Sequence, residues 1–149
     1  MMRKGPALAL AVFVILASAA LLSEAAFARS FYVDVRGHRI RVEVADTVEK
    51  TILGLSNRER LREEEGMLFL YPDKQTRTFW MKDMRFDLDI VWIAGNRIVR
   101  ISRNARAEGS RPSWIYDSGV PVDKVLEINA GLCERWGIRE GQQIVILER

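Results

Sequence analysis

Aromatic, acidic and basic side chains gather in one stretch of the sequence, residues 66–93, between two apolar runs. Neighbouring strand residues point to opposite faces, so Trp80 and Lys82 share one face of an expected strand and Phe79 and Met81 share the other. Phe79 and Met81 suit a core. A flat ring beside a cation and nearby acids suits a sugar or another amphipathic ligand. The alternative for Trp80 is packing against the long loop that follows later in the chain.

Two acids in the same stretch, Asp87 and Asp89, are two positions apart and point to the same face of an extended segment. Two carboxyl groups on one face can share a proton, flank a glycosidic bond or hold a cation. The simpler interpretation is that Asp87 is solvated and Asp89 accepts hydrogen bonds from loop backbone, as short polar side chains near turns do.

A third acid, Glu127, lies in the apolar segment VLEIN. Strand alternation places Leu126 and Ile128 on one face and Glu127 on the other. A glutamate that faces inward needs Arg58 or Lys82 as its partner, and a surface acid is the plainer alternative.

These residues suggest a single polar-aromatic pocket in which Asp89 and Glu127 line one cavity and Arg58 or Lys82 supplies positive charge. The candidate ligand-binding residues are Arg58, Trp80, Lys82, Asp87, Asp89 and Glu127.

Several other chemistries are excluded by composition. The chain has one cysteine, Cys133, and one histidine, His38, too few for a zinc site or an internal disulfide. A catalytic thiol needs a nearby base, and His38 lies in an expected hairpin turn, so burial is the expected role of Cys133. Phosphate-cradling, zinc-protease and nucleophile-elbow motifs are absent. We expect no metal and no cofactor.

The first 28 residues resemble an export signal. Arg3 and Lys4 precede an uncharged apolar stretch, Ala7 to Leu22, and Ala26-Phe27-Ala28 fits a cleavage site. The mature domain would then be residues 29–149, periplasmic or extracellular, with no remaining membrane span. The alternative is an uncleaved N-terminal anchor, although a spanning helix needs about 20 apolar residues.

The charge of the chain gives little support for nucleic acid as a partner. Removing residues 1–28 changes the net charge from +3 to +2, which is too mild for that purpose. Five arginines nevertheless follow the turn at Gly95-Asn96. They suit a solvated rim or a contact with anionic glycans or lipid head groups. They are Arg97, Arg100, Arg103, Arg106 and Arg111.

Alternating apolar residues predict many short strands. A hairpin is expected over residues 31–44, with its turn at 36–38, and further strands over 67–70, 78–81, 89–93, 98–101, 124–128 and 144–147. Residues 71–73 should stop the third strand, and residues 102–123 should form a long loop. The sequence therefore predicts a mostly β domain, a compact antiparallel β barrel or sandwich with two short helices.

The two helices have recognisable ends. The first should start at the capping box that begins with Asp46, bury Val48 and Ile52, and end near Gly54. The second should be capped by Asn129 and end at Gly137.

Three segments of the sequence, which carry four ordered blocks of the family pattern, resemble the DUF192 family, also called UPF0127. They begin with GLSNRERLREEEGMLFLYPD, continue with TFWMKDMRFDLDIVWI and end with KVLEINAGLCERWGIREGQQI. The resemblance spans residues 45–147 and implies a small β-rich domain, often exported or membrane-tethered, whose activity is not established. The matched positions are Gly54, Leu55, Arg58, Leu61, Gly66, Met67, Phe69, Phe79, Trp80, Met81, Lys82, Leu88, Asp89, Leu126, Glu127, Ala130 and Gly131.

The chain departs from the family pattern in two places. Asp83-Met84 follows the FWMK block where many relatives have small polar residues and threonine. Many relatives also have a cysteine pair in the region of residues 102–123, and this chain has none there. A loop geometry that depends on such a bridge is therefore not expected.

The resulting hypothesis is an exported cell-envelope domain that works as a binding or accessory module. Its partner would be a glycan or another small polar envelope ligand, not nucleic acid. One alternative is a hydrolase that uses a carboxyl pair on an envelope glycan, which needs two acids about 5 to 10 Å apart. The other is an interaction module with an exposed apolar patch and no pocket.

Overall fold

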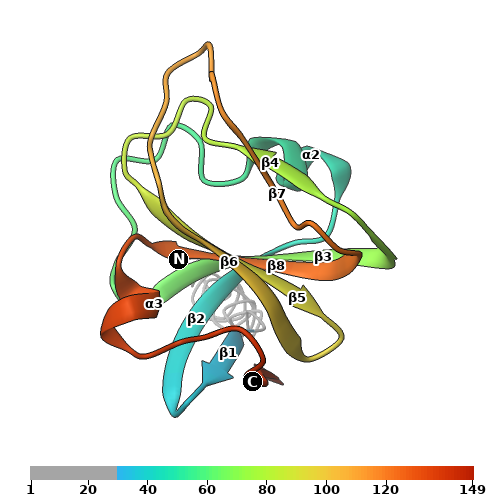
Figure 1. The fold of residues 1–149 in the computed structure, drawn as a ribbon. Coiled ribbons are helices and arrows are strands. Elements are labelled where there is room, and N and C mark those ends of the chain that lie inside the picture. Colours follow the sequence, from blue (N-terminus) through green and yellow to red (C-terminus); the bar gives the residue numbers. More distant parts are fainter. Residues whose placement is uncertain (1–29) are drawn as a thin grey trace, which may run out of the picture.

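The computed structural model describes residues 30–149, and the predicted signal and cleavage site lie outside these described residues. The described part is mostly β (Figure 1). Its elements are β1 (Phe31–Val35), β2 (His38–Ala45), α2 (Val48–Leu53), β3 (Glu65–Gln75), β4 (Thr78–Trp80), β5 (Leu88–Ala94), β6 (Arg97–Ala105), β7 (Ile115–Asp117), β8 (Val122–Asn129), α3 (Leu132–Arg135) and β9 (Val145–Glu148).

Seven strands form one mixed sheet in the order β6-β5-β8-β3-β2-β1-β9, and β4 pairs with β7 in a separate two-stranded sheet. All pairings are antiparallel except that of β2 with β3, which is parallel. The sheet curves into a sandwich-like shape without closing into a barrel. The mostly β, sandwich-like prediction is therefore confirmed, with one parallel pair that the sequence pattern did not reveal.

Apolar residues on the two faces of the sheet build two separate cores. The interior core comprises Val33, Val35, Ile40, Val42, Leu68, Val91, Ile93, Ile98, Leu126, Ile128, Leu132, Cys133, Ile138 and Ile144. The pocket-side core comprises Ala45, Leu55, Met67, Phe69, Met81, Leu88, Ile90, Trp92, Ala105, Val122 and Val125. Along residues 125–128 of β8, Val125 faces the pocket-side core, and Leu126 and Ile128 face the interior core, as the period of a strand requires.

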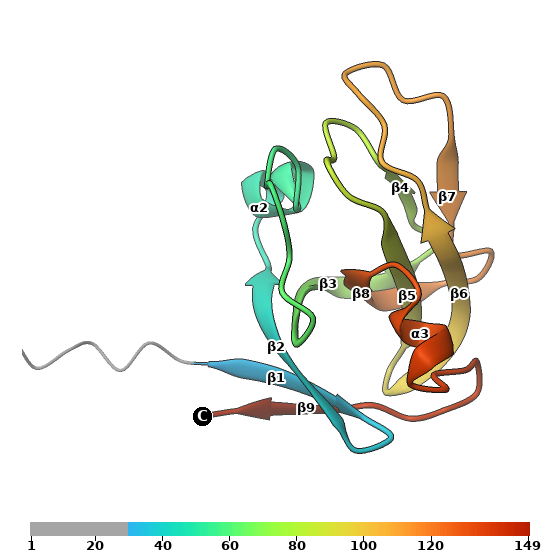
Figure 2. The ribbon, with the colours of Figure 1, turned by 90° about the vertical axis from the view of Figure 1, so that its left-hand side faces the viewer.

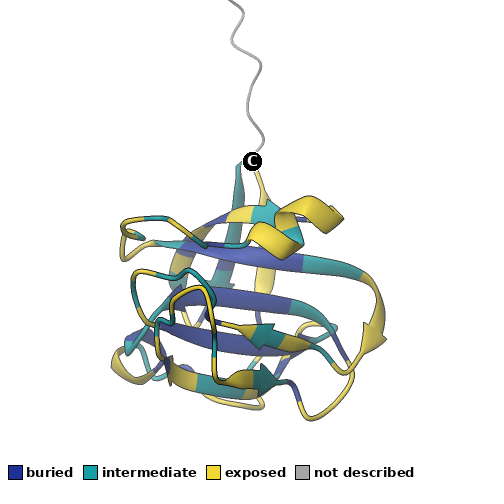
Figure 3. Ribbon diagram, turned by 90° about the horizontal axis from the view of Figure 1, so that it is seen from above, coloured by how far each residue is buried: buried dark blue, intermediate teal, exposed yellow. Residues whose placement is uncertain are grey.

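The pocket-side core is covered by α2, the β4–β7 pair and their loops. Figure 3 views this cover from above, with the largely exposed α2 lying over strands whose central residues are buried. Two loops of this cover are joined by backbone hydrogen bonds between residues 81–84 and 108–109. Glu108 positions the segment before β7, because its carboxylate accepts hydrogen bonds from the backbone N–H groups of Ser113 and Trp114.

Three expectations about the elements are wrong. Val48 and Ile52 of α2 are exposed, because the helix lies above the pocket instead of on a core. Asp46 is not the N-cap of α2; Thr47 is, and its hydroxyl accepts the backbone N–H of Lys50 at 3.3 Å. Asn129 does not cap α3, because its amide donates to the carbonyl oxygens of Leu61 and Arg62.

The third strand and the long loop also differ from expectation. β3 continues past Pro72 to Gln75, with a register shift against β8 between Leu70 and Gln75. Pro72 is tolerated because this end of the strand no longer follows the regular ladder. The expected loop over residues 102–123 is shorter, since β6 runs on to Ala105 and β7 occupies residues 115–117.

Candidate ligand-binding pocket

A pocket of about 330 Å³ lies between the pocket-side face of the sheet, α2 and the β4–β7 pair. Figure 2 shows α2 and the β4–β7 pair on the same side of β3 and β8. Most of the lining is apolar or aromatic. The lining residues are Thr51, Ile52, Leu53, Gly54, Leu55, Ser56, Phe69, Tyr71, Thr78, Phe79, Trp80, Met84, Ile115 and Glu127.

Glu127 is the one acid in this lining, and it is only 4% exposed. It stands on β8 between Met67 of β3 and Ile90 of β5 in the sheet register. Within residues 30–149, its carboxyl group has neither a hydrogen bond nor an ion pair, and its oxygens open into the pocket, since the fully enclosed side-chain polar atom without a partner is the Nε of Arg77. Burial therefore raises the pKa of Glu127 to about 8, because a charged carboxylate would be poorly solvated there. At neutral pH the group is mostly a neutral acid.

Tyr71 supplies a second polar group to the same pocket. Burial raises the pKa of its hydroxyl to about 12, with Arg77 opposing the shift and Glu127 adding to it. The guanidinium carbon of Arg77 lies 3.9 Å from the centre of the Tyr71 ring, which fixes the ring. The pocket therefore offers a carboxyl group and a phenol hydroxyl within mostly hydrocarbon walls.

The aromatic walls are held by contacts with the pocket-side core. The Phe79 ring lies edge-to-face with Phe69 at 4.8 Å and with Trp92 at 5.3 Å between ring centres. Trp80 is 52% exposed and lines the pocket, as expected, but Phe79, which alternation placed on the opposite face, lines it as well. Ser56 ties the α2 loop to this strand by donating to the carbonyl oxygen of Lys82 at 2.9 Å.

Large apolar side chains are exposed around the mouth of the pocket. Ile52 and Leu53 come from α2, Ile115 from β7 and Trp80 from β4, and all four are also lining residues. An exposed cluster of this kind marks a binding site more often than an ordinary surface.

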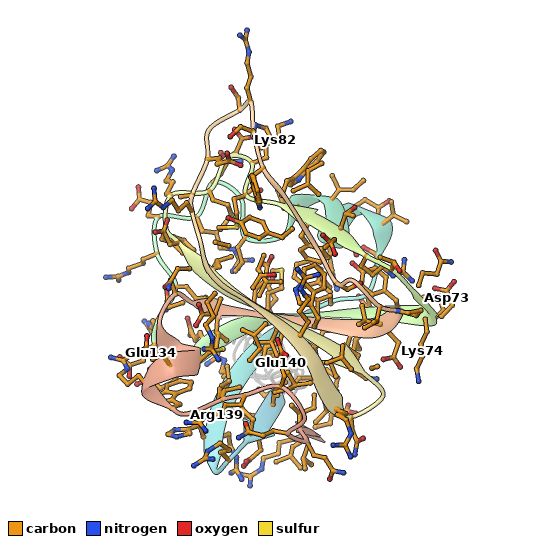
Figure 4. The ribbon with its side chains drawn as sticks, in the orientation of Figure 1. Asp73, Lys74, Lys82, Glu134, Arg139 and Glu140 are labelled. Carbon is orange, nitrogen blue, oxygen red and sulfur yellow. The ribbon has the colours of Figure 1, made fainter. Side chains whose placement is uncertain are left out.

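The two predicted cations do not pair with Glu127. Arg58 binds the carboxylate of Glu43, with 2.7 Å between nitrogen and oxygen. The ammonium of Lys82 lies 5.7 Å from the centre of the Trp80 ring and lines a neighbouring hollow with Glu49 and Asp83. Lys82 is on the side of the sheet that carries the cover, whereas Arg139 is on the other side (Figure 4). The expectation that either residue would neutralise Glu127 is wrong.

Asp89 and Glu127 do not share a cavity, so that part of the hypothesis is also wrong. Asp89 is fully buried and faces the interior core, on the opposite side of the sheet. Its two oxygens accept the backbone N–H groups of Asn104 and Cys133, both at 2.9 Å. Asp89 therefore caps the start of α3, where Gly131 has no side chain to do so.

Asp87 is also engaged with the backbone. It is exposed, and its carboxylate accepts the N–H of Ala107 at 2.7 Å. The predicted pair of acids therefore anchors loops, and the simpler interpretation of Asp89 is correct. The sequence reasoning missed Tyr71 and the α2 residues as pocket components. Alternation along β3 would have placed Tyr71 on the face of Met67 and Phe69, had the strand been extended past Leu70.

The expected burial of Cys133 is confirmed, whereas His38 begins β2 instead of lying in the hairpin turn. Cys133 is buried in the interior core, and burial together with nearby Asp89 raises the pKa of its thiol, which keeps it unreactive. His38 stacks on Trp136 at 4.7 Å between ring centres.

No group of three metal-ligating side chains forms among the described residues. Within residues 30–149, no helix is long and apolar enough to cross a membrane.

Two solved structures resemble this fold over most of its length. A Sinorhizobium meliloti 1021 protein, provisionally described as a transcription regulator, is 30% identical with a TM-score of 0.72, covering 79% of this chain and 93% of its own. A protein of unknown function from Novosphingobium aromaticivorans DSM 12444 is 34% identical with a TM-score of 0.69, covering 78% of this chain and 83% of its own. No curated protein matches the chain.

The sequence pattern of DUF192, described as an uncharacterized ACR, matches residues 31–146. This range includes every strand that forms the pocket, and it includes Asp87, Asp89 and Glu127. It agrees with the resemblance carried by the four sequence blocks. The chain therefore belongs to the DUF192 family.

Proposed function

We propose that this protein is an exported binding module of the cell envelope that holds a small amphipathic ligand in the pocket above Glu127. The observation behind the proposal is a buried carboxyl group without a partner at the floor of an open, mostly apolar pocket. Leaving such a group unpaired costs stability, and proteins accept such costs mainly at functional sites. A perturbed acid in a pocket is for the same reason a candidate binding residue.

The composition of the walls favours a compact ligand with an apolar body over a polyhydroxylated glycan. A glycan needs many hydrogen-bonding groups, whereas this pocket presents chiefly Glu127, Tyr71 and the hydroxyls of Thr51, Ser56 and Thr78. Ser56 already donates to backbone. One polar head on a hydrocarbon body matches the pocket better, because specificity in such sites comes from a few placed polar groups.

The alternative of a carboxyl-pair hydrolase has less support. Glu127 is the only acid in the pocket lining, and Asp89 lies on the other face of the sheet. The pocket-free interaction module also fits poorly, because the exposed apolar residues Ile52, Leu53 and Ile115 surround an existing pocket. Entry of a ligand through this mouth would account for the exposure of these three side chains.

A fragment screen read by melting temperature tests the proposal, because a ligand stabilises only the state that binds it. Fragments that raise the melting temperature of the natural protein should raise it much less in Glu127→Gln and Trp80→Ala. Matched controls are Glu134→Gln, an exposed acid on α3, and Trp114→Ala, 63% exposed and outside the pocket lining. Equal shifts in all four variants would contradict a site at Glu127, as would a screen without a hit.

A further inference from the structure

Four aromatic side chains line the pocket together with its one acid. Phe69, Tyr71, Phe79 and Trp80 all belong to the lining. The faces of aromatic rings attract cations, and a buried carboxylate is stable only with a counter-charge. None of the neighbouring cations in the described part of the chain pairs with this acid, because Arg58 binds Glu43 and the ammonium of Lys82 lies over the outer ring of Trp80. The guanidinium of Arg77 lies over the Tyr71 ring and pairs with Asp73.

We infer that the pocket accepts a small organic cation, an ammonium group on an apolar body, with Glu127 as its counter-ion. This inference rests on the proposed binding function and names the class of ligand. An anion would meet the negative ring faces and would gain only a hydrogen bond from the protonated acid, because its charge opposes the ionisation of Glu127. A neutral alcohol could use the protonated acid, but it would gain nothing from the ring faces.

Among the pocket residues, Glu127 is the one whose protonation state ligand binding is expected to change. β3 contributes Tyr71 to the lining, whose pKa is about 12, so its hydroxyl stays neutral near pH 7. Residues from α2, β4 and β7 in the lining, such as Thr51, Trp80 and Ile115, do not titrate. Glu49, Lys82 and Asp83 line the neighbouring hollow.

Binding of a cation is therefore coupled to loss of one proton. In the free pocket the pKa of Glu127 is about 8, so at pH 6 to 7 the acid is protonated. When an ammonium enters, the acid releases its proton to the solvent and becomes the carboxylate of an ion pair. Each pH unit below about 8 then weakens binding roughly tenfold, since one proton must be removed.

Isothermal titration calorimetry on the purified protein tests this with three probes that share one aromatic body. Phenethylamine has a cationic head, phenethyl alcohol a neutral one and phenylacetate an anionic one. An alkylammonium has a pKa of roughly 10, so the amine stays charged at pH 6 and 7. We expect phenethylamine to bind tightest, about tenfold tighter at pH 7 than at pH 6, with close to one proton released in buffers of different ionisation enthalpy.

The variants separate the possible outcomes. Glu127→Gln should abolish the pH dependence and the proton release, and Glu134→Gln should keep both. Equal affinity of the alcohol and the amine, with binding lost in Glu127→Gln, would overturn the cation inference and leave the pocket function standing. Phenethylamine that binds without proton release, or not at all, would overturn it as well; the fragment screen then decides separately whether the pocket binds ligands.

Discussion

At the scale of single residues, Glu127 is the group whose burial costs stability and whose carboxyl group serves the proposed binding function. Its side chain lies between Met67 and Ile90, which are both buried in the pocket-side core. An apolar residue there would complete that core. The carboxyl group instead leaves an acid at the floor of a pocket, which fits a site where stability is given up for binding.

The first prediction follows from the pKa of Glu127. The folded-state pKa of about 8 lies above the ordinary value of 4.5. The contribution of this acid to stability is therefore complete below pH 4.5 and is lost as pH rises through 8. Between pH 5 and 8 the loss is about 1 kcal/mol per pH unit.

Glu127→Gln, which stays neutral, should therefore become progressively more stable than the natural protein from pH 5 to 8. The measurement is urea unfolding at several pH values, and the difference between the two proteins cancels the titration of all other groups. Stability curves that run parallel over this range would show that Glu127 is not buried as a neutral acid.

At the scale of elements, Asp89 joins three parts of the chain. From β5 it accepts backbone N–H groups at the end of β6 and at the start of α3. An asparagine keeps one acceptor oxygen but turns an amide donor toward a backbone donor. Asp89→Asn should therefore destabilise the fold by about 2 to 3 kcal/mol. Asp87→Asn is the matched control and should cost less than about 1 kcal/mol, because Asp87 is exposed.

Ligand binding separates this structural role from a role in the pocket. Below its unfolding transition, Asp89→Asn should bind pocket ligands as the natural protein does, because Asp89 lies on the opposite face of the sheet. A selective loss of binding with unchanged stability would contradict this placement.

The contact between β3 and β8 supplies a third prediction. A Cβ atom at Gly66 would lie 2.7 Å from the carbonyl oxygen of Glu127. Gly66→Ala should therefore shift β8 and destabilise the protein by about 1 to 3 kcal/mol. Gly109→Ala is the control, since a Cβ there meets nothing within 4 Å. Thermal unfolding of both variants is the measurement, and equal melting temperatures would show that β3 and β8 are not so close.

Local patterns in the sequence predicted the parts of the elements that depend only on neighbouring residues. Alternation placed Glu127 opposite Leu126 and Ile128, and it placed exposed Trp80 on the face away from buried Met81. It wrongly separated Phe79 from Trp80, because both line the pocket. The partners of these residues depend on the order of strands, which local patterns do not contain. Asp89 and Glu127 were joined in one cavity for that reason, although the sheet places them on opposite faces.

The exposure of α2 could not be predicted for a related reason. Val48 and Ile52 have the spacing of a buried helix face, yet both are exposed. Ile52 lines the pocket beneath the helix, and no residue of α2 is buried. A mismatch between an apolar pattern and its burial is expected where a protein binds a ligand.

At the scale of the whole molecule, one curved sheet separates a closed core from a core that opens into a pocket. Strands and α3 complete the interior core, whereas the pocket-side core is only partly covered by α2 and the β4–β7 pair (Figures 1 and 2). This division explains why Glu127 can lie in the same strand as fully buried Leu126 and Ile128.

The proposed export of the protein gives a fourth prediction. The Ala26-Phe27-Ala28 site should be cut, so that protein purified from the cell envelope begins at Arg29. N-terminal sequencing is the measurement. An intact Met1 on protein recovered from a membrane fraction would indicate an anchor instead of an export signal.

A crystal structure of the protein grown with phenethylamine is the most direct test of the pocket. The prediction is ligand density between α2 and the β4–β7 pair, with the nitrogen within about 3 Å of a Glu127 carboxyl oxygen and the ring beside Trp80 or Phe79. Phenethylamine bound elsewhere, or with its nitrogen turned away from Glu127 toward the solvent, would contradict the assignment of this pocket as a ligand site built around that acid.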